Sequence, residues 1–475
     1  MSTNTIPADV RAPATDRIRP GIVLATLLTC QLMIVLDITV MNVALPRIHT
    51  DLHFSTTGLS WVMNAYSLVF GGLLLLGGRA GDLFGRRTLF IVGITLFTLA
   101  SLVGGLAPTA PWLIGARIAQ GIGGAMAGPS TLALLTTIFT EPKQRIRVLA
   151  LFSGMSSAGF AIGLIIGGLL TEWFGWRSAL FINVPFGAAA AVLALRYLPG
   201  SVRQPARLDL PGAFTATAGI ATLVYGFIHA AADGWGNTTT VLTLAIGAAL
   251  LATFLTIEFR TAQPLLPLRL FADRTRAAAY ANMFLGPMAG MSMFFFLTQY
   301  LQEVRAMSAL ATGFAFLPTA ALMFVMVRLI PRLLPRLGPK PLTITGTVLM
   351  GTGLALLALL RTDTGYFPML FVATVLLGCG LGLAFSPLNV IIMSTVPAQD
   401  AGAAGGALQT LQQTGSALGL AVLVTIFGTA ARATTGSPEQ VLVGGITAAF
   451  TAAVCIVVLT FLVALTFPGK TARTG

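Results

Sequence analysis

Two ionisable residues lie deep inside apolar stretches of this 475-residue chain, Asp37 and Arg117. A charged side chain within hydrocarbon costs several kcal/mol and is a functional candidate by default. A carboxylate at the depth of Asp37 could take up and release a proton. The alternative is a structural acid that bonds the backbone or a neighbour such as Thr39 or Asn42. We interpret Asp37 as a proton-carrying group.

Arg117 begins the segment RIAQGIGGAMAGPS. Because a guanidinium does not lose its charge in a protein, Arg117 must find acceptors or a wet cavity, and it can tune a nearby carboxylate. The alternative is a side chain that extends to the membrane surface, since few residues separate Arg117 from the preceding turn. We interpret Arg117 as a functional residue rather than a surface-reaching one.

The composition shows which elements must hold these residues. Of the chain, 56% is hydrophobic and only 9% is charged, against about 25% charged in a soluble protein. The net charge of +13 does not indicate a nucleic-acid partner, because the basic residues lie in short stretches between apolar runs. We predict an all-α polytopic membrane protein whose partner is the lipid bilayer.

Fourteen stretches are long and apolar enough to cross a bilayer, each needing roughly 20 residues. They lie at about 21–46, 58–78, 88–107, 111–138, 148–171, 178–198, 211–231, 238–258, 277–302, 308–328, 341–360, 366–393, 402–429 and 442–467. The alternate loops on the side of both termini hold 22 of the 28 basic residues. The excess predicts that both termini are cytoplasmic and that the protein lies in the cell membrane.

The short loop between the second and third stretches reads GGRAGDLFGRR and contains Gly78, Asp82, Gly85, Arg86 and Arg87. The carboxylate follows one helix and the two guanidinium groups begin the next, so they can pair across the helix ends and latch one conformation. The alternative is an ordinary cluster of positive charge on the cytoplasmic side.

Glycines recur every fourth residue in the fifth stretch, at Gly159, Gly163 and Gly167, with Gly168 adjacent. This spacing exposes backbone along one helix face and allows a neighbouring helix to approach closely. The stripe could serve close packing alone or the sliding of helices during gating.

Uncharged polar residues within the stretches are candidate substrate contacts, although each could instead form an interhelical hydrogen bond. They are Asn42, Asn64, Tyr66, Gln120, Asn282, Gln299, Asn389, Gln409 and Gln413, with an aromatic wall at 294–296. No acid lies in the interior of the stretches from 277 onward. The cavity is therefore expected to be neutral, which favours a neutral, anionic or weakly charged lipophilic substrate.

Other chemistry has little support in the sequence. His49 and His53 flank Asp51, but this set is too small for a convincing metal site. There is no nucleotide-binding lysine motif and no hydrolase signature. We expect no enzyme activity, no metal and no cofactor, with a proton gradient as the energy source.

These motifs together resemble the Major Facilitator Superfamily, specifically the fourteen-span drug:proton antiporters. GRAGDLFGRR resembles the superfamily's signature in the loop between spans 2 and 3. The segment around Asp37 resembles the family's motif in span 1, and Arg117 with Gln120 and Gly121 resembles its motif in span 4. WVMNAYSL and WRSALFINVP resemble further family segments, so the similarity extends from about residue 20 to 467.

The resemblance implies a proton-coupled antiporter that exports lipophilic drugs or antibiotics and works as a monomer. The alternative is a dedicated exporter of one endogenous metabolite, antibiotic or lipid. Asp37 and Arg117 would couple protons, and Asp82, Arg86 and Arg87 would form the cytoplasmic gate. The implied divisions are a tail at 1–20, a six-helix bundle at 21–200, an inserted helix pair at 201–260, a second six-helix bundle at 261–467 and a tail at 468–475.

Two positions depart from the family pattern. Leu164 stands after Gly163, where the antiporter motif of span 5 has proline. The segment PRLLPRLGPK resembles a second copy of the loop signature, with Pro335 in place of the carboxylate. A latch is therefore expected in the first half only.

Overall fold

The computed structural model describes residues 19–55, 58–200, 209–261, 264–266, 268–396 and 401–467. Within these ranges every regular element is helical. The two expected tails lie outside them, apart from residues 19 and 20. The all-α prediction is confirmed.

Each predicted stretch corresponds to a helix or to a pair of helical segments. Thirteen are long and apolar enough to cross a membrane, and the predicted stretch at 148–171 lies within the 33-residue α5. The helices are α1 (Pro20–Asp51), α2 (Ser60–Phe84), α3 (Arg86–Gly105), α4 (Ala110–Ile138), α5 (Pro142–Phe174), α6 (Ser178–Phe181), α7 (Asn183–Tyr197), α8 (Leu210–Asp233), α9 (Thr238–Arg260), α10 (Arg274–Gln299), α11 (Ala309–Ala315), α12 (Leu317–Leu337), α13 (Pro339–Leu357), α14 (Phe371–Thr395), α15 (Ala401–Ala433) and α16 (Pro438–Leu465), with short turns η2 (Leu268–Phe271), η3 (Tyr300–Val304) and η4 (Tyr366–Leu370).

Two of the stretches are interrupted beside a proline. Pro185 has no N–H for the carbonyl of Phe181, where α6 gives way to α7. Pro318 likewise cannot donate to the carbonyl of Phe314, and α11 is separated from α12 at Phe316. In both places the two segments belong to one predicted stretch.

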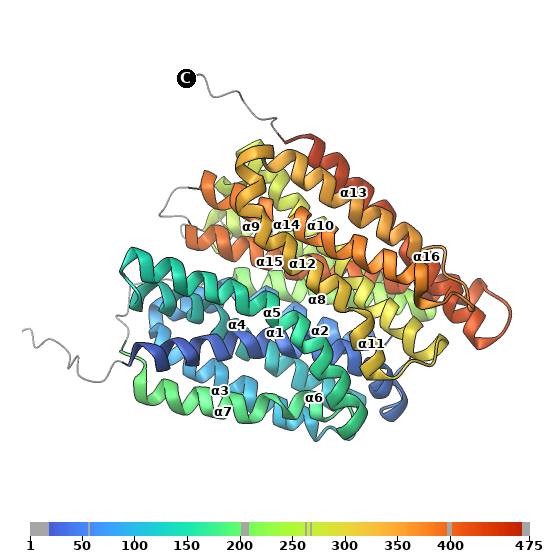
Figure 1. The fold of residues 1–475 in the computed structure, drawn as a ribbon, viewed down its shortest axis with the longest axis horizontal. Coiled ribbons are helices and arrows are strands. Elements are labelled where there is room, and N and C mark those ends of the chain that lie inside the picture. The colour runs from blue at the N-terminus through green and yellow to red at the C-terminus, as the bar shows by residue number, and fades with distance from the viewer. Residues whose placement is uncertain are drawn as a thin grey trace, which may run out of the picture.

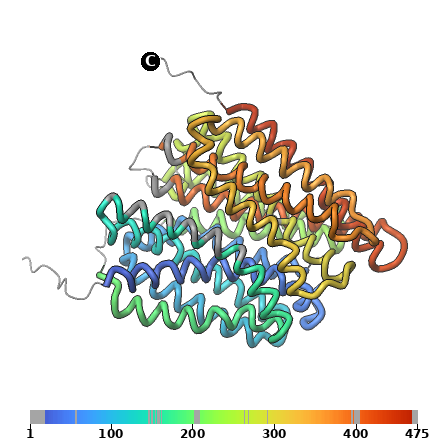
Figure 2. Tube along the Cα trace, in the orientation of Figure 1, coloured from blue at the N-terminus to red at the C-terminus, as the bar shows by residue number. Residues whose placement is uncertain are grey.

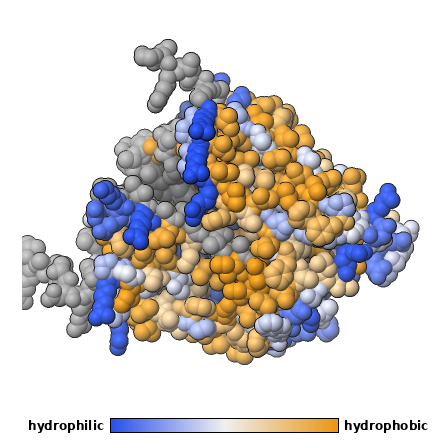
Figure 3. Space-filling view, viewed as in Figure 1, coloured by the Kyte–Doolittle hydropathy of each residue, from blue (hydrophilic) through white to orange (hydrophobic). Residues whose placement is uncertain are grey.

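The helices form two layers that run in similar directions (Figure 1). Helices α1–α7 make one layer and α10–α16 the other, as two six-helix halves. The loops gather at two ends, one with Pro20 and Leu465, here called the terminal end, and the opposite end. Hydrophobic side chains cover the surface between the ends, and hydrophilic ones gather toward them (Figure 3). This distribution fits a protein surrounded by lipid.

The two halves repeat one loop geometry. Gly85 joins α2 to α3 with a φ of 96°, and Gly338 joins α12 to α13 with a φ of 80°. Positive φ favours glycine over residues that carry a Cβ. The two glycines therefore mark equivalent points in the two halves.

The extra pair, α8 and α9, lies beside the seam between the halves. Helix α8 contacts α2 and α15. The hydroxyl of Thr425 on α15 donates a hydrogen bond to the carbonyl oxygen of Phe227 on α8. Helix α9 packs on α8, where Gly247 lies against Leu223. The pair thus covers one seam.

At the opposite end the halves are in direct contact. Gln302 donates from Nε2 to the carbonyl oxygen of Val43 over 3.0 Å, and His49 Nδ1 lies 3.4 Å from Glu303 Oε1. Figure 2 shows yellow α11 beside the teal end of α5 at this end. The structure therefore shows a state in which the two halves are closed against each other at the opposite end.

Candidate functional site

Asp37 and Arg117 meet in the first half, although they are far apart in sequence. Asp37 lies on α1 and Arg117 on α4, and neither side chain is exposed. Arg117 Nη1 donates directly to Asp37 Oδ2. The two deep charges predicted from the sequence thus form one buried ion pair.

Arg117 is held from three further directions. Its Nε donates to the carbonyl oxygen of Val62 over 3.0 Å, and its Nη1 also donates to Gln120 Oε1 over 2.9 Å. The guanidinium carbon lies 4.5 Å from the centre of the Tyr66 ring, a cation–π geometry. Arg117 does not extend to the membrane surface, so that alternative is wrong.

The second carboxylate oxygen of Asp37 is also occupied. Asp37 Oδ1 accepts hydrogen bonds from Gln120 Nε2 over 3.0 Å and from Asn183 Nδ2 over 3.1 Å. Gln120 Nε2 also donates to Ser101 Oγ over 2.8 Å. Five helices, α1 to α4 and α7, therefore contribute to one polar cluster around a single acid.

The neighbours considered as structural partners of Asp37 bond elsewhere. Thr39 donates its hydroxyl to the carbonyl oxygen of Leu36 over 3.0 Å. Asn42 Nδ2 donates to the carbonyl oxygen of Ile38 over 3.2 Å. Asp37 is therefore bound by Arg117, Gln120 and Asn183, and not by its own helix neighbours.

Sequence reasoning did not single out Asn183 or Ser101. Asn183 is 1% exposed and Ser101 0%. Asn183 lies within WRSALFINVP, a segment noted only for its resemblance to the family. A lone amide in an apolar stretch was the available signal, but the face that it occupies depends on how α7 packs.

Replacing Asn183 by leucine is expected to destabilise the first half by about 1.5 kcal/mol and to reduce gradient-driven transport. The change removes one hydrogen bond to a charged carboxylate, worth about 1.5 kcal/mol. The measurements are thermal unfolding of the purified protein and gradient-driven uptake in proteoliposomes, with Asn183→Gln to restore a donor. Unchanged stability and transport in the leucine variant would contradict this role.

The glycine stripe packs α5 against α1 beside Asp37. Gly159 faces Leu32, Gly163 faces Thr39, and Gly167 faces Val40. Gly168 instead faces Leu310 of α11, in the other half. The stripe therefore joins the charged cluster to the contact between the halves.

The loop between α2 and α3 forms the expected ion pair. Arg86 donates to Asp82 Oδ1 from Nε over 3.1 Å and from Nη2 over 2.9 Å. Arg87 Nη2 donates to the carbonyl oxygen of Leu195 over 2.6 Å, which ties α3 to α7. Gly78 lies near Pro129 of α4. In this state the ion pair of Asp82 with Arg86 lies within the first half.

A small cavity lies where the two halves meet, and Ile38, which follows Asp37 in sequence, is among its lining residues. Its volume is about 30 Å³. It is lined by Ile38, Asn42, Met63, Asn64, Ser67, Phe295, Gln413, Ser416, Ala417 and Leu420. None of these side chains is ionisable, in agreement with the predicted neutral cavity. A drug-sized ligand needs roughly 300 Å³ or more, so the cavity must widen to hold one.

Three of the nine candidate substrate contacts line this cavity: Asn42, Asn64 and Gln413. Tyr66 and Gln120 belong to the charged cluster instead. Asn282 and Gln299 are buried and donate within α10, whereas Gln409 is half-buried and Asn389 is exposed. These assignments as substrate contacts stay predictions.

The predicted aromatic wall is divided among three directions. Phe295 reaches the cavity. Phe294 packs on Phe160 of α5 with ring centres 5.0 Å apart, and Phe296 packs within the second half on Phe427. Successive residues of a helix point about 100° apart, so one of the three faces the cavity.

Two further buried acids lie near α8 and α9. Asp209 is 7% and Glu258 is 3% exposed. Asp209 accepts from the N–H of Gly212 over 2.9 Å, and Glu258 from the N–H of Leu266 over 2.9 Å. These bonds fix a helix start and a connecting loop. Among the described residues no three metal-binding side chains cluster.

Comparison with known proteins gives the family. The sequence profile of the Major Facilitator Superfamily matches residues 27–420. The chain therefore belongs to the Major Facilitator Superfamily, and it is a membrane transporter and not an enzyme.

Several curated relatives share most of the chain. Puromycin resistance protein pur8 of Streptomyces alboniger is 41% identical over 85% of this chain and 81% of its own length. Cephamycin export protein CmcT of Amycolatopsis lactamdurans is 38% identical over 90% and 88%. The lincomycin resistance protein of Streptomyces lincolnensis is 35% identical over 85% and 84%.

Solved structures agree on the fold. The human organic anion transporter MFSD10 superposes with a TM-score of 0.59, covering 94% of this chain and 98% of that one, at 16% identity. The nucleoside transporter NupG gives a TM-score of 0.60 over the same shares, at 14% identity. At such low identity these structures support the fold alone.

Proposed function

We propose that this transporter is a proton-coupled antiporter that exports lipophilic small molecules from the cytoplasm. The observation that carries the proposal is the fully buried pair of Asp37 and Arg117 in the half of the protein that borders the neutral cavity. The names of the relatives, which describe antibiotic resistance and export, support export as the direction. Asp37 would carry the proton, and no cofactor is required.

Coupling follows from the charge of this cluster. Protonation of Asp37 turns a neutral ion pair into one buried cation on Arg117. A buried charge that loses its partner costs about 3–5 kcal/mol, so the packed arrangement of α1 and α4 becomes less stable. Proton binding can then shift the balance between two arrangements of the halves.

The halves would alternate around the cavity by rocking. The contacts between Gln302 and Val43 and between His49 and Glu303 would break when the opposite end opens. With both termini in the cytoplasm, the opposite end faces the outside, and the present state is closed to it. The protein would act as a monomer in the cytoplasmic membrane, because both halves of the pathway belong to one chain.

A second candidate is a dedicated exporter of one endogenous compound. It is favoured by the similarity to a protein named for cephamycin export, which covers 90% of this chain. The neutral cavity suits either function. The two differ in substrate range.

The test is uphill transport in proteoliposomes with an imposed pH gradient, using a lipophilic dye and a neutral antibiotic. One proton moving through 100 mV supplies about 2.3 kcal/mol, enough for roughly fifty-fold accumulation. Gradient-driven movement of both compounds supports a multidrug exporter. If correctly folded protein transports neither compound, the multidrug proposal is wrong and the dedicated exporter is favoured.

A further inference from the structure

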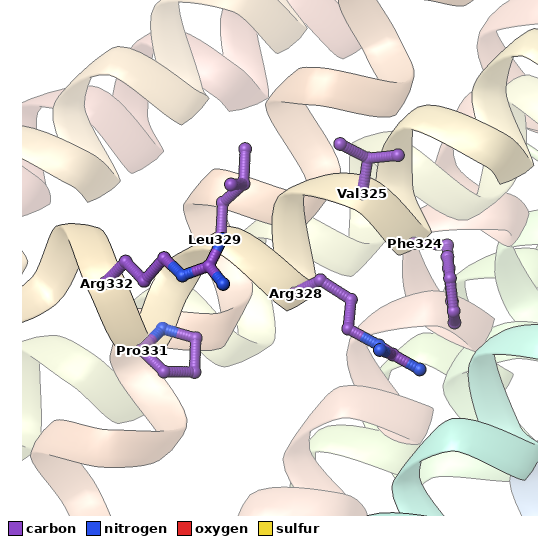
Figure 4. A pocket seen from close by; sticks show the side chains of 6 residues that line it. All are labelled: Phe324, Val325, Arg328, Leu329, Pro331 and Arg332. Atoms are coloured by element: carbon purple, nitrogen blue, oxygen red, sulfur yellow. The ribbon is translucent and has the colours of Figure 1, made fainter.

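A second cavity lies on α12, in the half of that helix nearer the terminal end. Its volume is about 450 Å³. Its described lining consists of Phe324, Val325, Arg328, Leu329, Pro331 and Arg332, drawn in Figure 4. The lining combines apolar surface with two guanidinium groups.

The two arginines are part of the helix and not of a loop. The predicted stretch ended at residue 328, but α12 continues to Leu337 through Pro331 and Pro335. Arg328 and Arg332 are one helical turn apart, so they can approach one ligand together. The Arg328 guanidinium carbon lies 5.1 Å from the centre of the Phe324 ring. In Figure 4 the Arg328 side chain extends toward Phe324, and the Arg332 side chain ends beside Leu329.

The internal repeat indicates which surface these residues occupy. Counting back from Gly85 and from Gly338 aligns Leu75 of α2 with Arg328 of α12. Leu75 lies against Gly406 of α15, so its position faces the seam between the halves.

The same count aligns Gly71 with Phe324, and Gly71 lies against Gln413 of α15. Helix α12 packs against α5 of the other half. Phe324 and Arg328 are thus assigned to the second seam between the halves.

Acids that could neutralise these arginines are missing from the helices around them. The sequences of α12, α13 and α14 contain no Asp or Glu. The one acid of α5, Glu172, lies near its far end and accepts the N–H of Leu310 over 2.9 Å. Two positive charges in a partly apolar cavity favour an anion as their counter-charge.

We infer that this cavity binds the anionic group of an amphipathic organic anion, which is the substrate class that the exporter takes up from the terminal end. Arg328 and Arg332 hold a carboxylate, phosphate or sulfonate through charge-assisted hydrogen bonds. Phe324, Val325 and Leu329 contact the apolar body. The inference rests on the proposed export function and adds the charge of the substrate.

The test compares two dyes that differ in one group: 1-anilinonaphthalene-8-sulfonate and its uncharged parent, N-phenyl-1-naphthylamine. Binding and transport are measured on the full chain in phosphatidylcholine vesicles, corrected with protein-free vesicles. The variant Arg328→Gln/Arg332→Gln is expected to bind the sulfonate about tenfold more weakly, with less than a twofold change for the uncharged dye. The double lysine variant should retain most of the sulfonate binding. Arg260→Gln, which removes a charge from exposed α9, should change neither.

Equal effects of the glutamine variant on both dyes, or an effect on neither, would overturn the inference. An anchor for lipid headgroups is distinguished by adding phosphatidylglycerol. The inference is also wrong if the glutamine variant loses transport of the uncharged dye only when phosphatidylglycerol is present, and if its binding of the sulfonate in phosphatidylcholine is unchanged. If wild-type protein binds the sulfonate through these arginines but transports neither dye, the anion site stands and the proposed function fails.

Discussion

Replacing Asp37 by asparagine is expected to abolish proton-driven transport and to destabilise the first half by about 3–5 kcal/mol. Asparagine has nearly the same shape but no charge, so Arg117 is left as an uncompensated buried cation. Arg117 makes its ion pair with Asp37 in a site with no exposed surface. The measurements are gradient-driven uptake in proteoliposomes and thermal unfolding of the purified protein.

The paired variant Asp37→Asn/Arg117→Gln separates the two effects. Removing both charges leaves neutral groups that can still hydrogen-bond with Gln120 and Asn183, so most of the lost stability should return. Proton-driven transport should not return, because no group is left to carry the proton. Full transport in either variant would contradict the assignment of Asp37, and equal instability in both would contradict the charge argument.

Replacing Gly168 by leucine is expected to reduce transport more than tenfold. A Cβ at this position would lie 2.7 Å from the Cα of Leu310 and 2.8 Å from the carbonyl oxygen of Ala309. These are backbone atoms of the other half and cannot move aside like a flexible side chain. The change should therefore hold the opposite end open, and Gly115→Leu is the matched control because nothing lies within 4 Å of a Cβ there.

The state of the opposite end can be read from labelling. A cysteine at Gln302, which bonds α1 in the closed state, should react faster with a membrane-impermeant maleimide when Gly168 is leucine. The native cysteines are first replaced by serine so that one thiol reports. Slow labelling together with normal transport in the leucine variant would show that this close approach is not needed.

The spans could be predicted from sequence because lipid imposes the same requirement on every crossing segment. Each must be apolar over about 30 Å and must satisfy its own backbone hydrogen bonds as a helix. Asp37 and Arg117 were recognisable for the same reason, since a charge at that depth is costly. That the two groups pair required the packing of α1 against α4.

Residues without charge were harder to assign. Asn183 bonds Asp37, whereas Asn389 is exposed on α14. Both are single amides in apolar helices, and only the rotation of each helix against its neighbours distinguishes them. For the same reason the sequence did not indicate which of the three consecutive phenylalanines reaches the small cavity between the halves, and in the structure it is Phe295.

The end of α12 was predicted too early because of its prolines. Pro331 and Pro335 indicated a loop after residue 328, but the helix continues to Leu337. Membrane helices tolerate proline where neighbouring groups satisfy the freed carbonyls. As a result Arg332, which lies beyond the predicted stretch, belongs to the same helix as Arg328, and both line a cavity.

The most direct test of proton antiport through Asp37 is the proton flux that accompanies substrate movement. Proteoliposomes that enclose a pH-sensitive dye receive a gradient of transported substrate and no imposed pH gradient. Substrate flow is expected to drive protons in the opposite direction with wild-type protein and to drive none with Asp37→Asn. Substrate movement without proton flux in the wild type, or undiminished proton flux in Asp37→Asn, would contradict it.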